Sequence, residues 1–208
     1  MKALIVSGFD WKDKKFGYKR SFFNRSGKIF KDFLINDLGL RKEDVFVYGV
    51  DQKRFSNIGL MRMIEMADRK SRKEPLVIYY TGHGFPSGWA FSTNVDLSYR
   101  SLIEILNKRL APLIVINDCC FAMSMALSLK KMKCRHLLIG ITMKNRIGYD
   151  DEGVIKEVLR FWRAKKLANP RYYDGKKFRR YVKLKSGKTI RVHLRRGSSL
   201  DYLFYPNA

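Results

Sequence analysis

The chain contains few acidic residues and few cysteines, and these two features restrict its possible partners and its cellular setting. Only 19 Asp and Glu stand against 43 Lys and Arg among its 208 residues, so the formal net charge is +24. A field of this sign attracts nucleic acid, an anionic membrane surface or an acidic protein. The three cysteines, of which Cys119 and Cys120 are adjacent, do not form the pattern of a disulfide framework, and this favours a reducing, intracellular setting.

Long apolar runs are also absent. No stretch approaches the roughly 18 apolar residues that a membrane-spanning helix needs, and the first apolar run, KALIVSGF (2–9), is too short for a secretory signal. We therefore expect a cytoplasmic protein with no membrane span. Hydrophobic residues still make up 46% of the chain, which is a globular composition, and the length suits a single well-buried core.

Apolar strand-like runs alternate with amphipathic helix-like segments as far as Lys166. The strands are apolar on both faces, which is typical of a mostly parallel sheet covered by helices on both sides. We predict strands over 2–9, 44–50, 75–84, 111–120 and 136–142, and helices over 24–40, 56–70, 97–110, 121–131 and 151–166. The predicted fold class is therefore α/β, with a mostly parallel sheet sandwiched by helices in three α/β/α layers.

The composition changes after Asn169-Pro170. The following segment is strongly basic and alternates around Ser186-Gly187-Lys188 as a β-hairpin would. We therefore divide the chain into a main domain, 1–169, and a basic C-terminal extension, 170–208, that packs on the same domain. Aromatic residues interleaved with the basic ones leave nucleic-acid binding open as a role for the hairpin. A solvated, positively charged surface is the alternative.

The histidines and cysteines are the reactive side chains to place. In an open α/β sheet, ligands bind beyond the carboxyl ends of the strands. His83 and the pair Cys119-Cys120 lie at the carboxyl ends of two predicted strands, which are joined by one crossover helix and are therefore expected to be neighbours in the sheet. The other three residues of these types fall at the opposite end of a strand or in the basic hairpin; they are Cys134, His136 and His193.

A cysteine beside a histidine can carry out nucleophilic acyl transfer, because the imidazole accepts the thiol proton or stabilises the thiolate. The predicted helix 121–131 begins at the cysteine pair, and its dipole would favour a thiolate. His83 lies between two glycines. Gly82 would let the chain turn out of the strand, and Gly84 would leave its N–H open to a substrate carbonyl oxygen. We therefore predict that His83 is presented to a substrate.

Two sequence blocks, VIYYTGHG (77–84) and LIVINDCC (113–120), resemble the caspase–legumain superfamily of cysteine peptidases. This group includes caspases, metacaspases, legumain, gingipain, separase and the catalytic subunit of GPI transamidase. Its pattern is an apolar strand ending in His-Gly, and later an apolar strand followed by an acidic or small pair and the nucleophilic cysteine. The resemblance implies a caspase-like fold over roughly residues 2–160 and the activity of a cysteine endopeptidase on a peptide or protein substrate.

The resemblance also implies a role for each matching residue. His83 corresponds to the catalytic histidine of the superfamily, and Gly84 to its oxyanion donor. Alignment of DCCFAMSM (118–125) with the metacaspase-like and transamidase-like motifs selects Cys120 as the nucleophile. Cys119 is then expected to be a buried small hydrophobe, which is the usual role of a free cysteine.

The resemblance also implies a substrate pocket that contains Asp118. This residue aligns with the position where metacaspases carry an acidic group for a substrate Arg or Lys. Charge compensation at the start of a helix is the alternative role for this carboxylate. Asp10, just after the first strand, is a candidate for a second pocket carboxylate. Two departures from the superfamily concern this pocket: Met123 replaces a glycine, and the basic segment 8–20 replaces an acidic one.

We expect no cofactor and no metal site. Some metacaspases need calcium, and the acidic segment YDDEG (149–153) offers oxygen ligands. Three adjacent acids before a helix more often cap its N-terminus. Calcium activation is therefore left open without a predicted site.

Three functions are consistent with the sequence. The first is a cysteine endopeptidase with a His83–Cys120 dyad that cleaves after Arg or Lys and processes itself in its own basic segments. The second is a caspase-like scaffold with little or no peptidase activity that binds nucleic acid or another polyanion. The third is a transamidase or ligase, in which an amine and not water captures the thioester.

Overall fold

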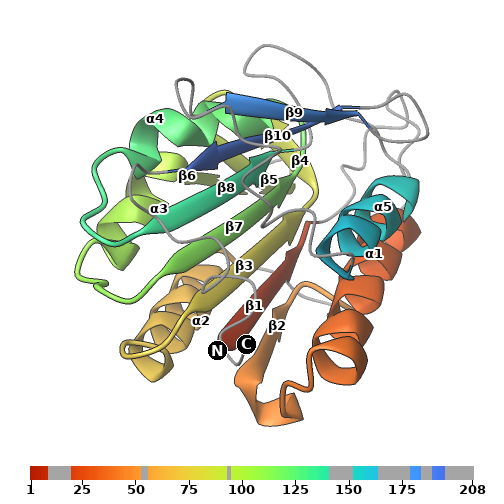
Figure 1. Ribbon diagram of the computed structural model, residues 1–208. Helices are drawn as coiled ribbons and strands as arrows, with labels where there is room; N and C mark the ends of the chain where they lie inside the picture. Colours follow the sequence, from red (N-terminus) through yellow and green to blue (C-terminus); the bar gives the residue numbers. More distant parts are fainter. Residues whose placement is uncertain are drawn as a thin grey trace.

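The computed structural model describes residues 1–8, 20–52, 56–92, 95–140, 152–163, 179–183 and 189–194. They contain a seven-stranded sheet with the strand order β2-β1-β3-β7-β8-β10-β9 (Figure 1). The first five strands in this order are parallel, which confirms the predicted α/β class with a mostly parallel sheet. Their bounds are Val45–Tyr48 for β2, Lys2–Ser7 for β1, Leu76–Thr81 for β3, Leu113–Asp118 for β7 and His136–Gly140 for β8.

Two antiparallel strands extend the sheet beyond β8. β10 (Thr189–Leu194) pairs with β8, and β9 (Arg179–Lys183) pairs with β10. The predicted basic hairpin therefore forms and belongs to the main sheet. Its turn and the expected boundary at residue 169 lie outside the described residues, so the division into 1–169 and 170–208 stays a prediction.

Helices cover both faces of the sheet, so the three predicted layers are present (Figure 1). One face carries α1 (Arg20–Asp32), its π-helical continuation η2 (Phe33–Asp37) and α5 (Glu152–Arg163). The other face carries α2 (Asn57–Lys70), α3 (Tyr99–Leu106) and α4 (Met125–Leu129). A short 3-10 turn, η3 (Lys42–Asp44), leads into β2.

The central strand β3 is buried along its whole length. Its side chains alternate between two apolar clusters: Leu76, Ile78 and Tyr80 pack on the α2/α3/α4 side, whereas Val77 and Tyr79 pack on the α1/α5 side. Burial on both faces explains why the strands of the sheet are continuous apolar runs in the sequence.

A small antiparallel sheet follows β3 and was not predicted. Its strands are β4 (His83–Phe85), β5 (Gly88–Ser92) and β6 (Val95–Ser98), in the order β4-β5-β6. It is held to the core by Trp89, whose ring stacks on Tyr80 with centroids 4.4 Å apart and an interplanar angle of 16°. These strands have only three to five residues, which is too little hydrophobic alternation to be recognised before that packing is known.

The predicted helix 121–131 is not continuous. The chain leaves β7 through Phe121, which has left-handed backbone angles (φ 55°, ψ 24°), then forms a 3-10 turn, η4 (Ala122–Ser124), and only then the short helix α4. A full helix dipole at the cysteine pair was therefore a wrong expectation. One 3-10 turn and a five-residue helix align too few peptide dipoles to act as a macrodipole.

Among the described residues, every helix falls short of the length and apolarity required to cross a bilayer.

A buried arginine connects the ends of α2 and α3 to β7. The Arg109 guanidinium donates from Nη1 to Asp68 Oδ1 and to Ser71 Oγ, each at 3.0 Å, and from Nη2 to the carbonyl oxygens of Glu74 and Pro112. The side chain of Arg109 is 0% exposed and that of Asp68 is 8% exposed. A buried ion pair of this kind is costly to break on one side only, because the remaining charge is left in the core.

We expect Arg109→Met to lower the free energy of unfolding by about 3–5 kcal/mol, because it leaves the buried Asp68 carboxylate without its cation. The matched control is Arg100→Met, which breaks an exposed Arg–Glu pair on α3 (83% and 62% exposed) and should cost about 0.5 kcal/mol or less. Urea denaturation of both variants measures the difference. Equal losses in the two variants would contradict a structural role for the buried pair.

Candidate functional site

The two predicted motifs meet at the carboxyl edge of the sheet. β3 and β7 are adjacent and parallel, with Thr81 opposite Asp118, and the Gly82 N–H donates to the Asp118 carbonyl oxygen at 3.2 Å. His83 and Cys120 each follow this Thr81–Asp118 pair by two residues. The expectation that the two strands are neighbours is therefore confirmed.

Gly84 packs directly against the cysteine pair. A Cβ atom at Gly84 would collide with the carbonyl oxygen of Cys120 and would lie 2.7 Å from Cys119 Sγ. Gly82 is also confined, since a Cβ there would lie 2.5 Å from Tyr80 Oη. Both glycines are thus required by close approach, and the one at 84 brings the backbone beside His83 into contact with the Cys119-Cys120 segment.

His83 begins β4 and is half-buried. Its ring meets the ring of Phe23 on α1 edge to face, with centroids 5.3 Å apart and an interplanar angle of 84°. Its carbonyl oxygen accepts a hydrogen bond from Tyr80 Oη at 2.5 Å. Burial lowers the pKa of His83 below its ordinary 6.5. The imidazole is therefore neutral at pH 7, the form that can accept a proton.

The two adjacent cysteines have different environments. Cys119 is 5% exposed, and its thiol donates to Asn117 Oδ1 at 3.2 Å. Burial, with a smaller contribution from the charge of Cys120, raises the pKa of Cys119 well above its ordinary value, so this thiol stays protonated. Cys120 is only half-buried. A thiolate forms and reacts at an accessible cysteine and not at a buried one.

Asp118 ends β7 and is half-buried. Its Oδ2 accepts a hydrogen bond from Tyr79 Oη at 2.9 Å. Burial, followed by the charge of this carboxylate, raises the pKa of Tyr79 well above 10, so the phenol keeps the proton that it donates. Tyr79 belongs to the apolar cluster under α1 and α5, and Phe23, the ring that contacts His83, lies on α1. Asp118 and His83 are therefore on the same side of the sheet edge.

The remaining predicted site residue, Asp10, lies outside the described residues. The same holds for most of the acidic segment at 149–153, of which Glu152 and Gly153 begin α5. Within the described part of the chain, no group of three His, Cys, Asp or Glu side chains is arranged to hold a metal ion.

Asn117 lies directly beside this edge and was not among the predicted site residues. It is fully buried, although the strand that carries it is otherwise apolar up to Asp118. Its amide links three elements: it accepts from Trp89 Nε1 at 2.7 Å, and donates to Tyr99 Oη at 3.2 Å and to the Ala122 carbonyl oxygen at 2.9 Å. A lone asparagine next to the last position of an apolar strand was the available indication.

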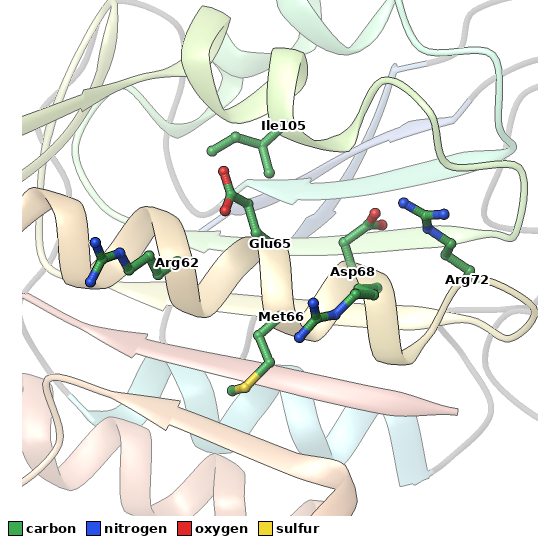
Figure 2. A pocket seen from close by; sticks show the side chains of 7 residues that line it. Arg62, Glu65, Met66, Asp68, Arg72 and Ile105 are labelled. Carbon is green, nitrogen blue, oxygen red and sulfur yellow. The ribbon is translucent and has the colours of Figure 1, made fainter.

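A separate pocket of about 480 Å³ lies between α2 and α3 (Figure 2). Its lining combines three arginines, a glutamate and apolar side chains: Arg62, Arg69, Arg72, Glu65, Met66 and Ile105. Asp68, which also lines it, forms the buried pair with Arg109. The pocket therefore shares no residue with the His83–Cys120 edge.

The lowered pKa of His83 predicts how stability depends on pH. Below about pH 6.5 the unfolded chain binds a proton that folded His83 resists, so the free energy of unfolding should fall as the pH falls through this range. His83→Gln should lack this contribution. We expect the free energy of unfolding of the wild type to fall, relative to that of His83→Gln, as the pH is lowered from about 7.5 to 5.5. Urea denaturation of both proteins measures this difference. A pH-independent difference would contradict the lowered pKa.

No family model matches the sequence, and no curated protein does either. Among solved structures, the fold is similar to that of caspase-1 from Spodoptera frugiperda, with a TM-score of 0.52 over 78% of this chain and 68% of that chain. The sequence identity is 14%, so the similarity concerns the fold and leaves the closer resemblance to metacaspases and legumain a prediction. The chain has a caspase-like α/β fold.

Proposed function

We propose that the chain is a cysteine endopeptidase in which His83 assists Cys120. The observation that carries the proposal is the close packing of Gly84 on the Cys120 carbonyl oxygen and the Cys119 side chain, at an edge formed by two neighbouring parallel strands. This contact brings the segment that follows β3 and the segment that follows β7 together, as a His–Cys dyad requires. The caspase-like fold provides the matching scaffold.

In this mechanism the neutral His83 imidazole takes the proton of the Cys120 thiol, and the thiolate attacks the carbonyl carbon of the scissile peptide bond. The N–H groups of Gly84 and Cys120 hold the oxyanion of the tetrahedral intermediate. The His83 imidazolium then gives its proton to the leaving amine, and a thioester remains on Cys120. Water hydrolyses this thioester and releases the acid product.

β4 is an edge strand of the small sheet, and an edge strand leaves alternate backbone groups open to a ligand.

A basic residue at P1 is the specificity that we propose. The Asp118 carboxylate is held by Tyr79 on the same side of the edge as His83, and a carboxylate in a partly desolvated site pairs well with a guanidinium or ammonium group. Asp10 is the proposed second carboxylate. Self-cleavage in basic stretches such as WKDKKFGYKR (11–20) follows from this specificity. If an amine replaced water in the last step, the same dyad would act as a transamidase.

Turnover of fluorogenic peptides with Arg, Lys, Asn or Asp at P1 tests the proposal. We expect cleavage after Arg or Lys, a loss of at least about a thousandfold in Cys120→Ala, and a loss of about tenfold to a hundredfold in kcat/KM for Asp118→Asn, the value of a charged hydrogen bond. Cys119→Ser is the matched control and should keep most of the turnover. Addition of an amine nucleophile, with mass analysis of the product, separates a transamidase from a hydrolase.

Two outcomes would contradict parts of this proposal. Cleavage after Asn that persists in Asp118→Asn would keep the dyad and exclude the acidic P1 pocket. Failure of the wild type to cleave any of the four peptides, with or without added calcium, would exclude the endopeptidase.

A second function, polyanion binding, is supported by the pocket on α2. Arg62 and Arg72 lie at its two ends (Figure 2), and Arg69 lies between them in the sequence. Asp68 is neutralised by Arg109, which leaves Glu65 as the acid that opposes three guanidinium groups. Phosphate groups along a nucleic-acid backbone suit such a row of arginines.

We expect a fluorescent DNA duplex to bind with a strong salt dependence, and the triple variant Arg62→Glu/Arg69→Glu/Arg72→Glu to weaken binding at least tenfold and reduce the salt slope by about three. In the control variant, three exposed lysines near α4, at positions 130, 131 and 133, are replaced by glutamate, which changes the net charge by the same amount. Fluorescence anisotropy at about 50–200 mM salt measures both. Equal weakening in the two variants would assign the binding to net charge and not to the pocket. Cys120→Ala should bind as the wild type does.

A further inference from the structure

The side-chain amide of Asn117 uses its complete hydrogen-bonding capacity. Its oxygen accepts two hydrogen bonds, from Trp89 Nε1 at 2.7 Å and from Cys119 Sγ at 3.2 Å. Its nitrogen donates two, to Tyr99 Oη at 3.2 Å and to the Ala122 carbonyl oxygen at 2.9 Å. An asparagine offers two acceptor positions and two N–H donors. The network is thus complete at a fully buried residue, where a missing partner would be costly.

Two of these hydrogen bonds enclose the cysteine turn. The bond from Cys119 fixes the chain at one end, and the bond to the Ala122 carbonyl fixes it at the other, so that only Cys120 and Phe121 lie between the two fixed points. Phe121 has left-handed backbone angles (φ 55°, ψ 24°), which a residue with a Cβ adopts only when its surroundings require it. The hydrogen bond from Asn117 to Ala122 is an interaction that favours this strained turn.

The other two hydrogen bonds tie the turn to the rigid part of the molecule. Trp89 belongs to β5, the neighbour of the strand that begins with His83, and Tyr99 begins α3. Both aromatic side chains are buried. Asn117 therefore connects the segment that carries His83 to the segment that carries the two cysteines.

From this network we infer that Asn117 is a positioning residue that decides which of the two adjacent thiols reacts. It holds Cys119 in the core as a hydrogen-bond donor, and it holds the left-handed turn that leaves Cys120 at the sheet edge beside Gly84. This inference rests on the proposed function, because it concerns the same nucleophile. It predicts that the thiols lose their distinct reactivities when the amide is removed.

The experiment is alkylation of the folded protein with limiting iodoacetamide, followed by peptide mass mapping of the modified cysteines. In the wild type we expect modification at Cys120, with Cys119 and the buried Cys134 protected. Asn117→Leu, which keeps the approximate shape of the side chain but removes its four hydrogen bonds, should lower the ratio of Cys120 to Cys119 alkylation about tenfold, the factor for one hydrogen bond of ordinary strength. Trp89→Phe is the control, since it removes one donor and leaves the bond to Ala122.

A rescue variant makes the test specific to the turn. Glycine adopts left-handed angles without strain, so Phe121→Gly added to Asn117→Leu should return the ratio to within about threefold of the wild type. Where the substrate peptides are cleaved, kcat should fall in Asn117→Leu and recover in the double variant, with little change in KM. A merely structural role would lower stability without this rescue of thiol selectivity.

Failure of the inference and failure of the proposed function give different results. An unchanged alkylation ratio in Asn117→Leu would overturn the inference, and so would a lowered ratio that Phe121→Gly does not restore. If Asn117→Leu does not fold, the smaller Asn117→Ser is used with the same criteria. The alkylation needs no peptide substrate, so a protein that cleaves nothing but shows the expected ratios would exclude the proposed function and keep the inference.

Discussion

The register between β3 and β7 is the constraint on which the candidate site depends. With Thr81 opposite Asp118, the residues that follow the two strands emerge at the same level, and Gly84 can pack on the cysteine pair. A slip of one residue would exchange the faces of every side chain on one strand. Asn117 would then leave Trp89 and Tyr99, and Asp118 would leave Tyr79. The pairing of two apolar strands thus fixes a polar arrangement that neither strand specifies alone.

The sheet separates the supporting network of the site from the groups proposed to do chemistry. On the α2/α3/α4 side, Asn117 binds neutral partners in a closed and buried network. On the other side of the edge, His83 and Asp118 remain half-buried beside α1 and Tyr79. Alternation along β7 places consecutive residues on opposite faces. A buried network of neutral groups therefore lies directly behind His83 and Asp118 and adds no charge to their surroundings.

The sequence was sufficient for the parts of the fold that follow from local pattern. The five parallel strands were recognisable because burial on both faces leaves continuous apolar runs, and the TGHG and DCC motifs could be located at strand ends. The small sheet β4–β6 could not be recognised from the sequence, since it depends on Trp89 stacking on Tyr80. The interruption of the helix after Cys120 could not be recognised either, because the left-handed Phe121 is stabilised by a hydrogen bond from Asn117 to a residue five positions along the chain. Apolar periodicity cannot reveal a single buried amide.

The excess of basic residues acts on the two proposed functions in opposite directions. Two described acids form ion pairs at the opposite end of the strands from the site. Asp44 accepts hydrogen bonds from Arg41 and Lys2, which lower its pKa to about 2, and Glu74 binds the N-terminal amine. The net charge of the chain is still strongly positive. Its electrostatic field therefore attracts a polyanion and opposes the approach of a substrate with Arg or Lys at P1. Salt screens both effects over a distance of about 10 Å. Ionic strength should therefore weaken DNA binding while it relieves the repulsion of a basic peptide, so the two functions can be distinguished on one unmodified protein.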